Sequence, residues 1–170
     1  MIGFHIKIYY TYKYWMTNKN IFVYWGQGYN KIPNLLKKIY DNNKLLSEQS
    51  GLRLHLIDDN NVNNYIETHP RFEQLEYNFK SDMIRFYILN KYGGFWFDMD
   101  IIIIKDLNKL YNDLLNLNNI DMSVDVEHLW NDGIDGIKLG SASIFMKKNS
   151  ICSEHCLNYV NNILNNSINL

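Results

Sequence analysis

Two aspartates separated by one residue, Asp98 and Asp100, have the side-chain type and spacing that most directly suggest chemistry in this sequence. If the backbone is extended there, alternate side chains point to the same side, so both carboxylates would face one space. Carboxylate oxygens suit Mg²⁺ and Mn²⁺, and Mg²⁺ is typically held by one or two carboxylates together with substrate phosphates. The pair therefore predicts a divalent-cation site, with a solvated turn as the alternative.

A second charged pair, Asp82 and Arg85, lies three residues apart in a segment that is otherwise mostly apolar. In a helix this spacing puts both side chains on one face. Burying a carboxylate and a guanidinium is costly unless each has a partner. The simpler alternative is that Asp82 and Arg85 pair with each other and have no further role. Because Gly93-Gly94 leads directly into the strand before Asp98, ligand hydroxyls and phosphates in a shared cleft are the functional alternative.

The elements that must position these residues follow from hydrophobic patterning. In the first part of the chain we expect a helix from 81 to 91, with Ser81 as its N-cap and Gly93-Gly94 as its end. Helical spacing is also expected after Pro33 as far as Tyr40, followed by the polar residues 41–43 and a weaker helical stretch to Ser50. Strands are expected at 21–25, 52–57, 95–97 and 101–104. The alternation of strands and helices predicts one α/β domain with a mainly parallel sheet flanked by helices, residues 21–170, preceded by an N-terminal extension, residues 1–20.

The C-terminal part is expected to hold a helix near 107–117, a strand near 120–126, a strand at 143–146 and a closing helix from about 151 to 163. Between the two strands we expect an irregular acidic loop, which could face an acceptor or could be plain surface. Its polar residues are Asp125, Glu127, His128 and Asp132.

Taken in order, the residues resemble a known family. Ser81-Asp82-x-x-Arg85 followed by Leu89-x-x-x-Gly93-Gly94-x-x-x-Asp98-x-Asp100 resembles the central motif of glycosyltransferase family 32. That family includes yeast-type initiating mannosyltransferases and bacterial capsular polysaccharide synthesis proteins. The upstream segments 24–28 and 56–66 resemble the capsular branch, so the resemblance spans roughly residues 21–107. It implies a GT-A fold, a Rossmann-like domain that uses nucleotide-diphospho-sugars.

The resemblance also implies roles. Asp98 and Asp100 would hold Mn²⁺, or Mg²⁺, at the donor diphosphate, and Asp82 and Arg85 would contact the donor sugar as catalytic residues. Trp25 would stack on the base, unless it is a core indole, and Asp58 or Asp59 would contact the ribose or base. The donor would be a UDP- or GDP-sugar, the acceptor a glycan or protein, and the anomeric configuration would be retained.

Two departures from the family pattern leave alternatives open. Capsular-branch proteins often carry Thr where Asp100 stands, and family domains usually continue past the length seen here, so a C-terminal part may be missing. A catalytically inactive domain that binds a nucleotide-sugar or glycan is therefore one alternative. A haloacid-dehalogenase-type phosphatase is another, because Asp98-Met99-Asp100 superficially matches its nucleophile motif.

Composition narrows the partners and the setting. The net charge is −1 and no stretch concentrates Lys and Arg, so nucleic acid is not expected as a partner. No run reaches the roughly 20 apolar residues of a membrane span, and no signal peptide is evident, which predicts a soluble, cytoplasmic protein. Cys152 and Cys156, four apart in the closing helix, are expected to be reduced thiols.

Overall fold

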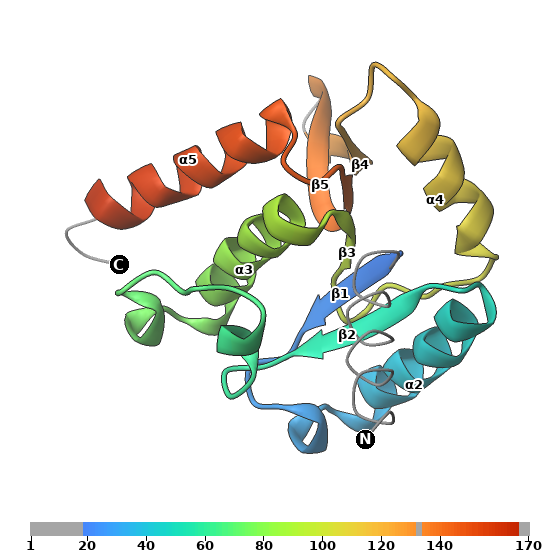
Figure 1. Ribbon diagram of the computed structural model, residues 1–170, viewed down its shortest axis with the longest axis horizontal. Helices are drawn as coiled ribbons and strands as arrows, with labels where there is room; N and C mark the ends of the chain where they lie inside the picture. Colours follow the sequence, from blue (N-terminus) through green and yellow to red (C-terminus); the bar gives the residue numbers. More distant parts are fainter. Residues whose placement is uncertain (1–18, 132–133, 167–170) are drawn as a thin grey trace, which may run out of the picture.

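The computed structural model describes residues 19–131 and 134–166 and shows a five-stranded sheet between two layers of helices (Figure 1). The strand order is β2-β1-β3-β5-β4. β1 pairs in parallel with β2 and β3, whereas β5 is antiparallel to β3 and to β4. The predicted α/β architecture is confirmed. The strands are β1 (Asn20–Tyr24), β2 (Arg53–Ile57), β3 (Gly94–Phe97), β4 (Met122–Asn131) and β5 (Ile134–Met146).

Alternating side chains give the sheet two apolar faces, as the period of a strand requires. In β1, Phe22 and Tyr24 join the core beneath α3 (Tyr77–Tyr92) and α5 (Ile151–Asn166). Ile21 and Val23 join the core beneath α2 (Asn34–Gln49) and α4 (Leu107–Asn116). Figure 1 shows α3 and α5 on one side of the strands and α2 and α4 on the other.

The parallel strands set the position of the site. Because β1, β2 and β3 run in one direction, their carboxyl ends meet at one edge of the sheet, where α/β domains of this kind bind ligands. The segments that follow them are residues 25–28, 58–61 and 98–100.

The strand predicted at 101–104 is wrong, since this segment runs without regular structure. Its backbone bonds instead to a buried side chain of α2. Asn43 Nδ2 donates to the carbonyl of Ile101 at 2.6 Å, and Asn43 Oδ1 accepts from the amide of Ile103 at 2.9 Å. One amide side chain thus satisfies the backbone groups that a neighbouring strand would otherwise take, which a run of isoleucines does not reveal.

The start of α3 was also predicted wrongly. The helix begins at Tyr77, and Ser81 lies inside it instead of capping it. The extra turn is favoured by burial, because Lys80 is only 5% exposed and reaches a carboxylate in another segment. The predicted end is confirmed: Gly93 follows the helix with φ 66°.

The C-terminal strands are longer than expected. The region predicted as an irregular acidic loop belongs to the paired strands β4 and β5, whose register runs to Asn131 opposite Ile134. Apolar residues at every second position, Met122, Val124 and Val126, already follow the period of a strand. The side chains of Asp125, Glu127 and His128, and the whole of Asp132, lie outside the part of the chain that the structure describes.

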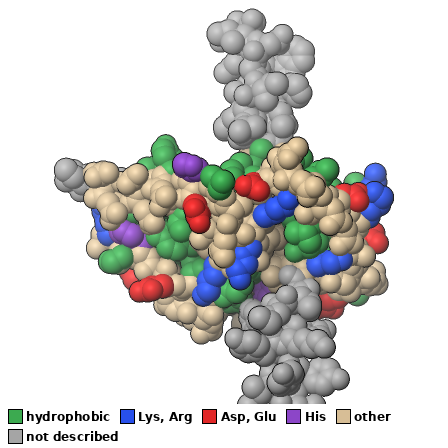
Figure 2. All heavy atoms as spheres, turned by 45° about the horizontal axis from the view of Figure 1, so that its top comes forward, with side chains coloured by type: hydrophobic (Ala, Val, Ile, Leu, Met, Phe, Trp, Pro, Cys, Tyr) green, Lys and Arg blue, Asp and Glu red, His purple; other side chains and the backbone are tan. Residues whose placement is uncertain are grey.

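Three further expectations concern the chain as a whole. Cys152 and Cys156 are free thiols, as predicted. No helix within residues 19–131 and 134–166 is long and apolar enough to cross a membrane. Figure 2 shows acidic and basic side chains interspersed over the displayed face, without a field of one sign. Residues 1–18 of the predicted extension lie outside the described residues.

Candidate active site

A pocket of about 470 Å³ opens at the carboxyl edge of the parallel strands. Its walls come from the end of β1 and the loop after it, the first half of α3, the end of β3 with the turn that follows, and Ser141 of β5. Four of the predicted site residues line it together. They are Trp25, Asp82, Arg85 and Asp98.

Arg85 lies at the floor of the pocket and links two acidic residues. Its Nη2 is 3.2 Å from Asp98 Oδ1 and 3.3 Å from Asp82 Oδ1. The side chain is 4% exposed, and its guanidinium carbon lies 5.3 Å from the centre of the Trp96 ring. Arg85 Nε is buried and has no hydrogen-bond partner among the described residues. Asp82 and Arg85 therefore do pair, but the pair extends to Asp98 and borders the pocket.

Asp98 is half-buried at the end of β3. Its Oδ1 accepts hydrogen bonds from Trp96 Nε1 at 2.9 Å and from Arg85 Nη2. Burial raises the pKa of the Asp98 carboxyl above its usual value. The Trp96 hydrogen bond and the Arg85 charge oppose that rise, whereas Asp100 and Asp82 add to it. Both hydrogen bonds use one oxygen, so they leave the second oxygen available to another ligand.

The Asp98-Met99-Asp100 segment is a turn, so the expectation of an extended backbone there is wrong. The amide of Asp98 still bonds across the sheet to the carbonyl of Ala142 at 2.8 Å, but the amide of Ile101 folds back to the carbonyl of Asp98 at 3.1 Å. Asp100 is exposed and does not line the pocket, although it is close enough to influence the charge of Asp98.

The two aspartates fit a divalent cation only as part of its ligand shell. Within the described ranges, no three His, Cys, Asp or Glu side chains gather in a metal-binding group. A cation held at Asp98 and Asp100 would therefore take its remaining ligands from water or from a bound phosphate, which is the usual arrangement for Mg²⁺. Asp98 is half-buried with one uncommitted oxygen and Asp100 is exposed, and both suit that role.

Trp25 serves both the pocket and the core. Its ring is partly buried against the core beneath α2, yet it also lines the pocket. Its indole Nε1 is buried without a hydrogen-bond partner in the described part of the chain. The two readings of this tryptophan, core indole and ligand platform, are thus compatible.

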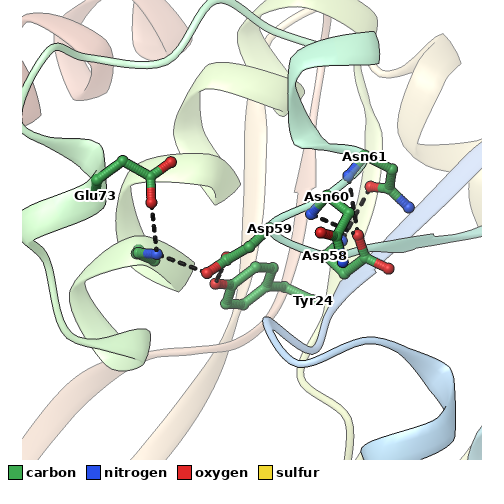
Figure 3. Close-up of polar contacts among 7 residues, drawn as sticks. Tyr24, Asp58, Asp59, Asn60, Asn61 and Glu73 are labelled. Carbon is green, nitrogen blue, oxygen red and sulfur yellow. Dashed lines mark hydrogen bonds and ion pairs between the residues drawn. The ribbon is translucent and has the colours of Figure 1, made fainter.

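Asp58 and Asp59 do not line the pocket. Asp58 Oδ1 accepts hydrogen bonds from the backbone amides of Asn60 and Asn61, each at 2.9 Å, so this carboxylate stabilises the turn after β2. Asp59 accepts from the Tyr24 hydroxyl on Oδ1 and contacts Lys80 through Oδ2 (Figure 3). Asp59 thus contacts Tyr24, which lines the pocket, without lining it itself.

The sequence prediction missed Tyr24, Trp96 and Lys80, all of which contact a predicted site residue. For Lys80 a signal was present. Four and eight residues after it come Ile84 and Ile88, both fully buried, so Lys80 continues the buried stripe of α3. A lysine on such a stripe must have a buried partner. Tyr24 and Trp96 carried no comparable signal, since aromatic residues in strands usually belong to the core.

The chain resembles known proteins in sequence and in fold. It is 28% identical over 120 residues to an uncharacterised glycosyltransferase of Acanthamoeba polyphaga mimivirus, a match that covers 66% of this chain and 45% of that protein. The chain thus spans somewhat less than half the length of this curated relative. The solved structure of the PaToxG glycosyltransferase has a TM-score of 0.59 at 17% identity, covering 96% of this chain and 70% of that one. At this identity the likeness establishes the fold.

Family membership follows from a longer match. Residues 6–136, well over half of the chain, match the family described as capsular polysaccharide synthesis protein. The fit includes β1, β2, α3 and β3, and with them Trp25, Asp82, Arg85, Asp98 and Asp100. The chain therefore belongs to the capsular polysaccharide synthesis protein family.

Proposed function

We propose that this chain transfers a sugar from a nucleoside-diphosphate sugar to a glycan or protein acceptor, with Mn²⁺ or Mg²⁺ as cofactor. The observation that carries the proposal is the convergence of Trp25, Asp82, Arg85 and Asp98 on one pocket at the carboxyl ends of parallel strands. The aromatic ring suits the base of such a donor, and the buried guanidinium suits its phosphates and hydroxyls. The partly exposed carboxylates suit the sugar hydroxyls and the cation. The names of the mimivirus relative and of the PaToxG structure are consistent with it.

Each side chain has a task that its surroundings allow. Trp25 offers a partly buried ring against which a base can stack. Arg85 lines the pocket and is held by two carboxylates, so its guanidinium can donate to a sugar hydroxyl or phosphate oxygen. Asp82, which is 58% exposed, can accept hydrogen bonds from sugar hydroxyls.

Asp98 and Asp100 would hold the divalent cation. When bound, the cation supplies neutralisation of the charge that develops on the leaving nucleoside diphosphate. Asp98 is oriented for this by Trp96 and Arg85, which fix the same carboxylate oxygen. We expect the anomeric configuration to be retained, as the resemblance to family 32 implies.

The test is donor turnover with a metal requirement. The purified chain is incubated with Mn²⁺ or Mg²⁺ and a panel of UDP- and GDP-sugars, and release of UDP or GDP is measured. We expect release to depend on the cation and to fall roughly a hundredfold in Asp98→Asn and Asp100→Ala, with both variants still folded. Asp113→Ala, which removes an exposed aspartate of α4, serves as the matched control and should retain full turnover.

The same panel separates the alternatives. Cation-dependent binding of the donor without turnover would contradict the transferase and favour a binding domain. Release of inorganic phosphate from simple monoesters would contradict it in favour of a phosphatase. Calorimetric titration of Mn²⁺ into the protein, in the presence of UDP or GDP, tests the metal site separately from turnover.

A further inference from the structure

We propose that Asp59 is a positioning residue that, with Tyr24 and Lys80, locks the wall of the donor pocket behind Trp25 and does not itself touch the donor. This assignment deepens the proposed function, since it says how the nucleoside end of that pocket keeps its shape. It also separates Asp59 from the direct base or ribose contact that the family resemblance implied.

Both oxygens of Asp59 are committed within the protein (Figure 3). Oδ1 accepts from the Tyr24 hydroxyl at 2.5 Å, and Oδ2 lies 2.6 Å from Lys80 Nζ. Burial, followed by the hydrogen bond to Asp59, raises the pKa of Tyr24 well above its usual value, so the hydroxyl remains a donor. A carboxylate whose two oxygens are engaged by a phenol and an ammonium has little capacity left for a ligand.

Lys80 is committed in the same way. It is 5% exposed, and its Nζ lies 3.8 Å from Glu73 Oε2 in addition to Asp59. The ammonium also lies 4.5 Å from the centre of the Phe72 ring. A buried lysine of this kind is stable only with its carboxylate in place, because an unpaired buried charge is strongly unfavourable.

The three side chains come from the three segments that build this side of the pocket. Tyr24 ends β1, Asp59 lies in the turn after β2, and Lys80 belongs to the first turns of α3. The carboxylate of Asp59 therefore ties the turn after β2 to the end of β1 and to α3 at one point. Tyr24 lines the pocket, whereas Asp59 and Lys80 do not.

The backbone at Trp25 and Gly26 is hydrogen-bonded to the end of β2 and to Asp59. The amide of Asp59 donates to the carbonyl of Gly26 at 3.1 Å, and the amide of Trp25 donates to the carbonyl of Ile57 at 2.9 Å. A β-carbon at Gly26 would lie 2.6 Å from the Tyr24 hydroxyl and 2.4 Å from the Tyr77 ring. Glycine at this position leaves room for Tyr24 to reach Asp59, so the loop, the phenol and the carboxylate form one fitted unit.

The first arm of the experiment needs no ligand. Amide hydrogen exchange is measured in the full chain for wild type, Lys80→Met, Asp59→Asn and the double variant. We expect exchange at Trp25, Gly28 and Asp59 to accelerate roughly tenfold in all three variants, while the amide of Ile103, held by Asn43 elsewhere, is unchanged. The double variant should recover much of the thermal stability lost in Lys80→Met, because it leaves no unpaired charge, yet its local exchange should stay fast.

The second arm measures binding of UDP and GDP by calorimetry. Lys80→Met is decisive because Lys80 does not line the donor pocket, and we expect it to weaken binding roughly tenfold, like Asp59→Asn. Two matched controls repeat the chemistry at side chains that do not line the pocket. Lys109→Met breaks an exposed Lys–Asp pair, and Tyr29→Phe breaks an exposed Tyr–Asp hydrogen bond. Both should leave binding and local exchange unchanged.

The outcomes are distinct. If binding weakens in Asp59→Asn but not in Lys80→Met, Asp59 touches the ligand directly and the positioning role is overturned. If both variants lose thermal stability without faster exchange at Trp25, Gly28 and Asp59, the pair is merely structural and the role is again overturned. If wild type binds neither UDP nor GDP, the proposed donor fails, while the exchange arm still decides whether Asp59 and Lys80 hold this loop.

Discussion

Arg85 Nη2 lies 3.2 Å from Asp98 Oδ1, so a buried cation on α3 meets the carboxylate that ends β3. This contact connects the Asp82/Arg85 pair of α3 with the Asp98/Asp100 pair that follows β3. The carboxylate is 36% exposed and the guanidinium 4% exposed, so the arginine supports Asp98 from the protein side and leaves its other side open to the pocket. This arrangement makes Arg85 important for stability as well as for binding.

We expect Arg85→Met to lower the free energy of unfolding by about 2 kcal/mol, because it leaves Asp82 and Asp98 facing each other without their shared cation. The loss is no larger because solvent screens both carboxylates, which are partly exposed. Arg85→Lys should restore only part of the lost stability, since an ammonium cannot reproduce the contact of the guanidinium with the Trp96 ring. Urea unfolding measures the loss. Lys109→Met, which breaks the exposed pair with Asp113, should change stability by less than about 0.5 kcal/mol.

Asn43 is a buried side chain of α2 that holds the backbone after Asp100 in place. Its side chain satisfies one backbone carbonyl and one backbone amide of the segment that follows Asp100. Asn43→Leu keeps the branching of the side chain but leaves both groups without this partner, and we expect a loss of about 2–3 kcal/mol in unfolding free energy. Faster amide exchange at Ile103 should accompany it. Asn112→Leu removes a hydrogen bond between side chains on α4 and is the control; an equal loss in both variants would contradict a specific role for Asn43.

The parts of the fold that depend on local pattern were predictable from the sequence. The strands that became β1, β2 and β3, and the glycine end of α3, follow from apolar runs and turn residues. The grouping of Trp25, Asp82, Arg85 and Asp98 in one pocket also agrees with the prediction. For Trp25 and Asp98 it follows from the rule that parallel strands bring their carboxyl ends together. Asp82 and Arg85 lie on α3 instead, and their place beside Asp98 was expected because Gly93-Gly94 leads this helix directly into β3.

The parts that failed depend on contacts between segments far apart in the chain. Residues 101–104 have the composition of a strand, but a side chain 60 residues earlier takes up the amide of Ile103. The early start of α3 depends on Lys80 finding Asp59, 21 residues away. Propensity describes what a segment favours alone, and in both cases one buried polar contact decided the outcome.

Gly94 provides a prediction about the join between α3 and β3. Its φ is 107°, and a β-carbon there would lie 2.4 Å from the carbonyl oxygen of Asn20 in β1. Gly94→Ala combines backbone strain with a clash against a fixed strand, and we expect a loss of about 3 kcal/mol or more. Gly51→Ala is the control, because Gly51 has φ 69° but nothing within 4 Å of the added carbon. It should cost only about 1 kcal/mol. Similar losses in the two variants, measured by thermal unfolding, would contradict the steric argument.

His55 makes stability depend on pH. The ring is 5% exposed, stacks on Phe22 at 5.0 Å between centroids, and lies 3.1 Å from Asn20 Oδ1. Burial, with a smaller contribution from the Arg53 charge, lowers the pKa of His55 from 6.5 to about 4. Between these two values the unfolded chain binds a proton that the folded chain does not. Stability from this group is therefore present above pH 6.5 and is lost as pH falls toward 4.

We expect wild type to lose up to about 3 kcal/mol of unfolding free energy through His55 between pH 7 and pH 4, since each unit of pKa difference corresponds to about 1.4 kcal/mol. His55→Gln removes the titrating group, so its stability should fall less steeply over the same interval, and the gap between the two proteins should narrow as the solution is acidified. His155→Gln, at an exposed position of α5, should follow wild type. Urea unfolding at four or more pH values checks this, and parallel curves for wild type and His55→Gln would show that the buried ring does not control the acid response.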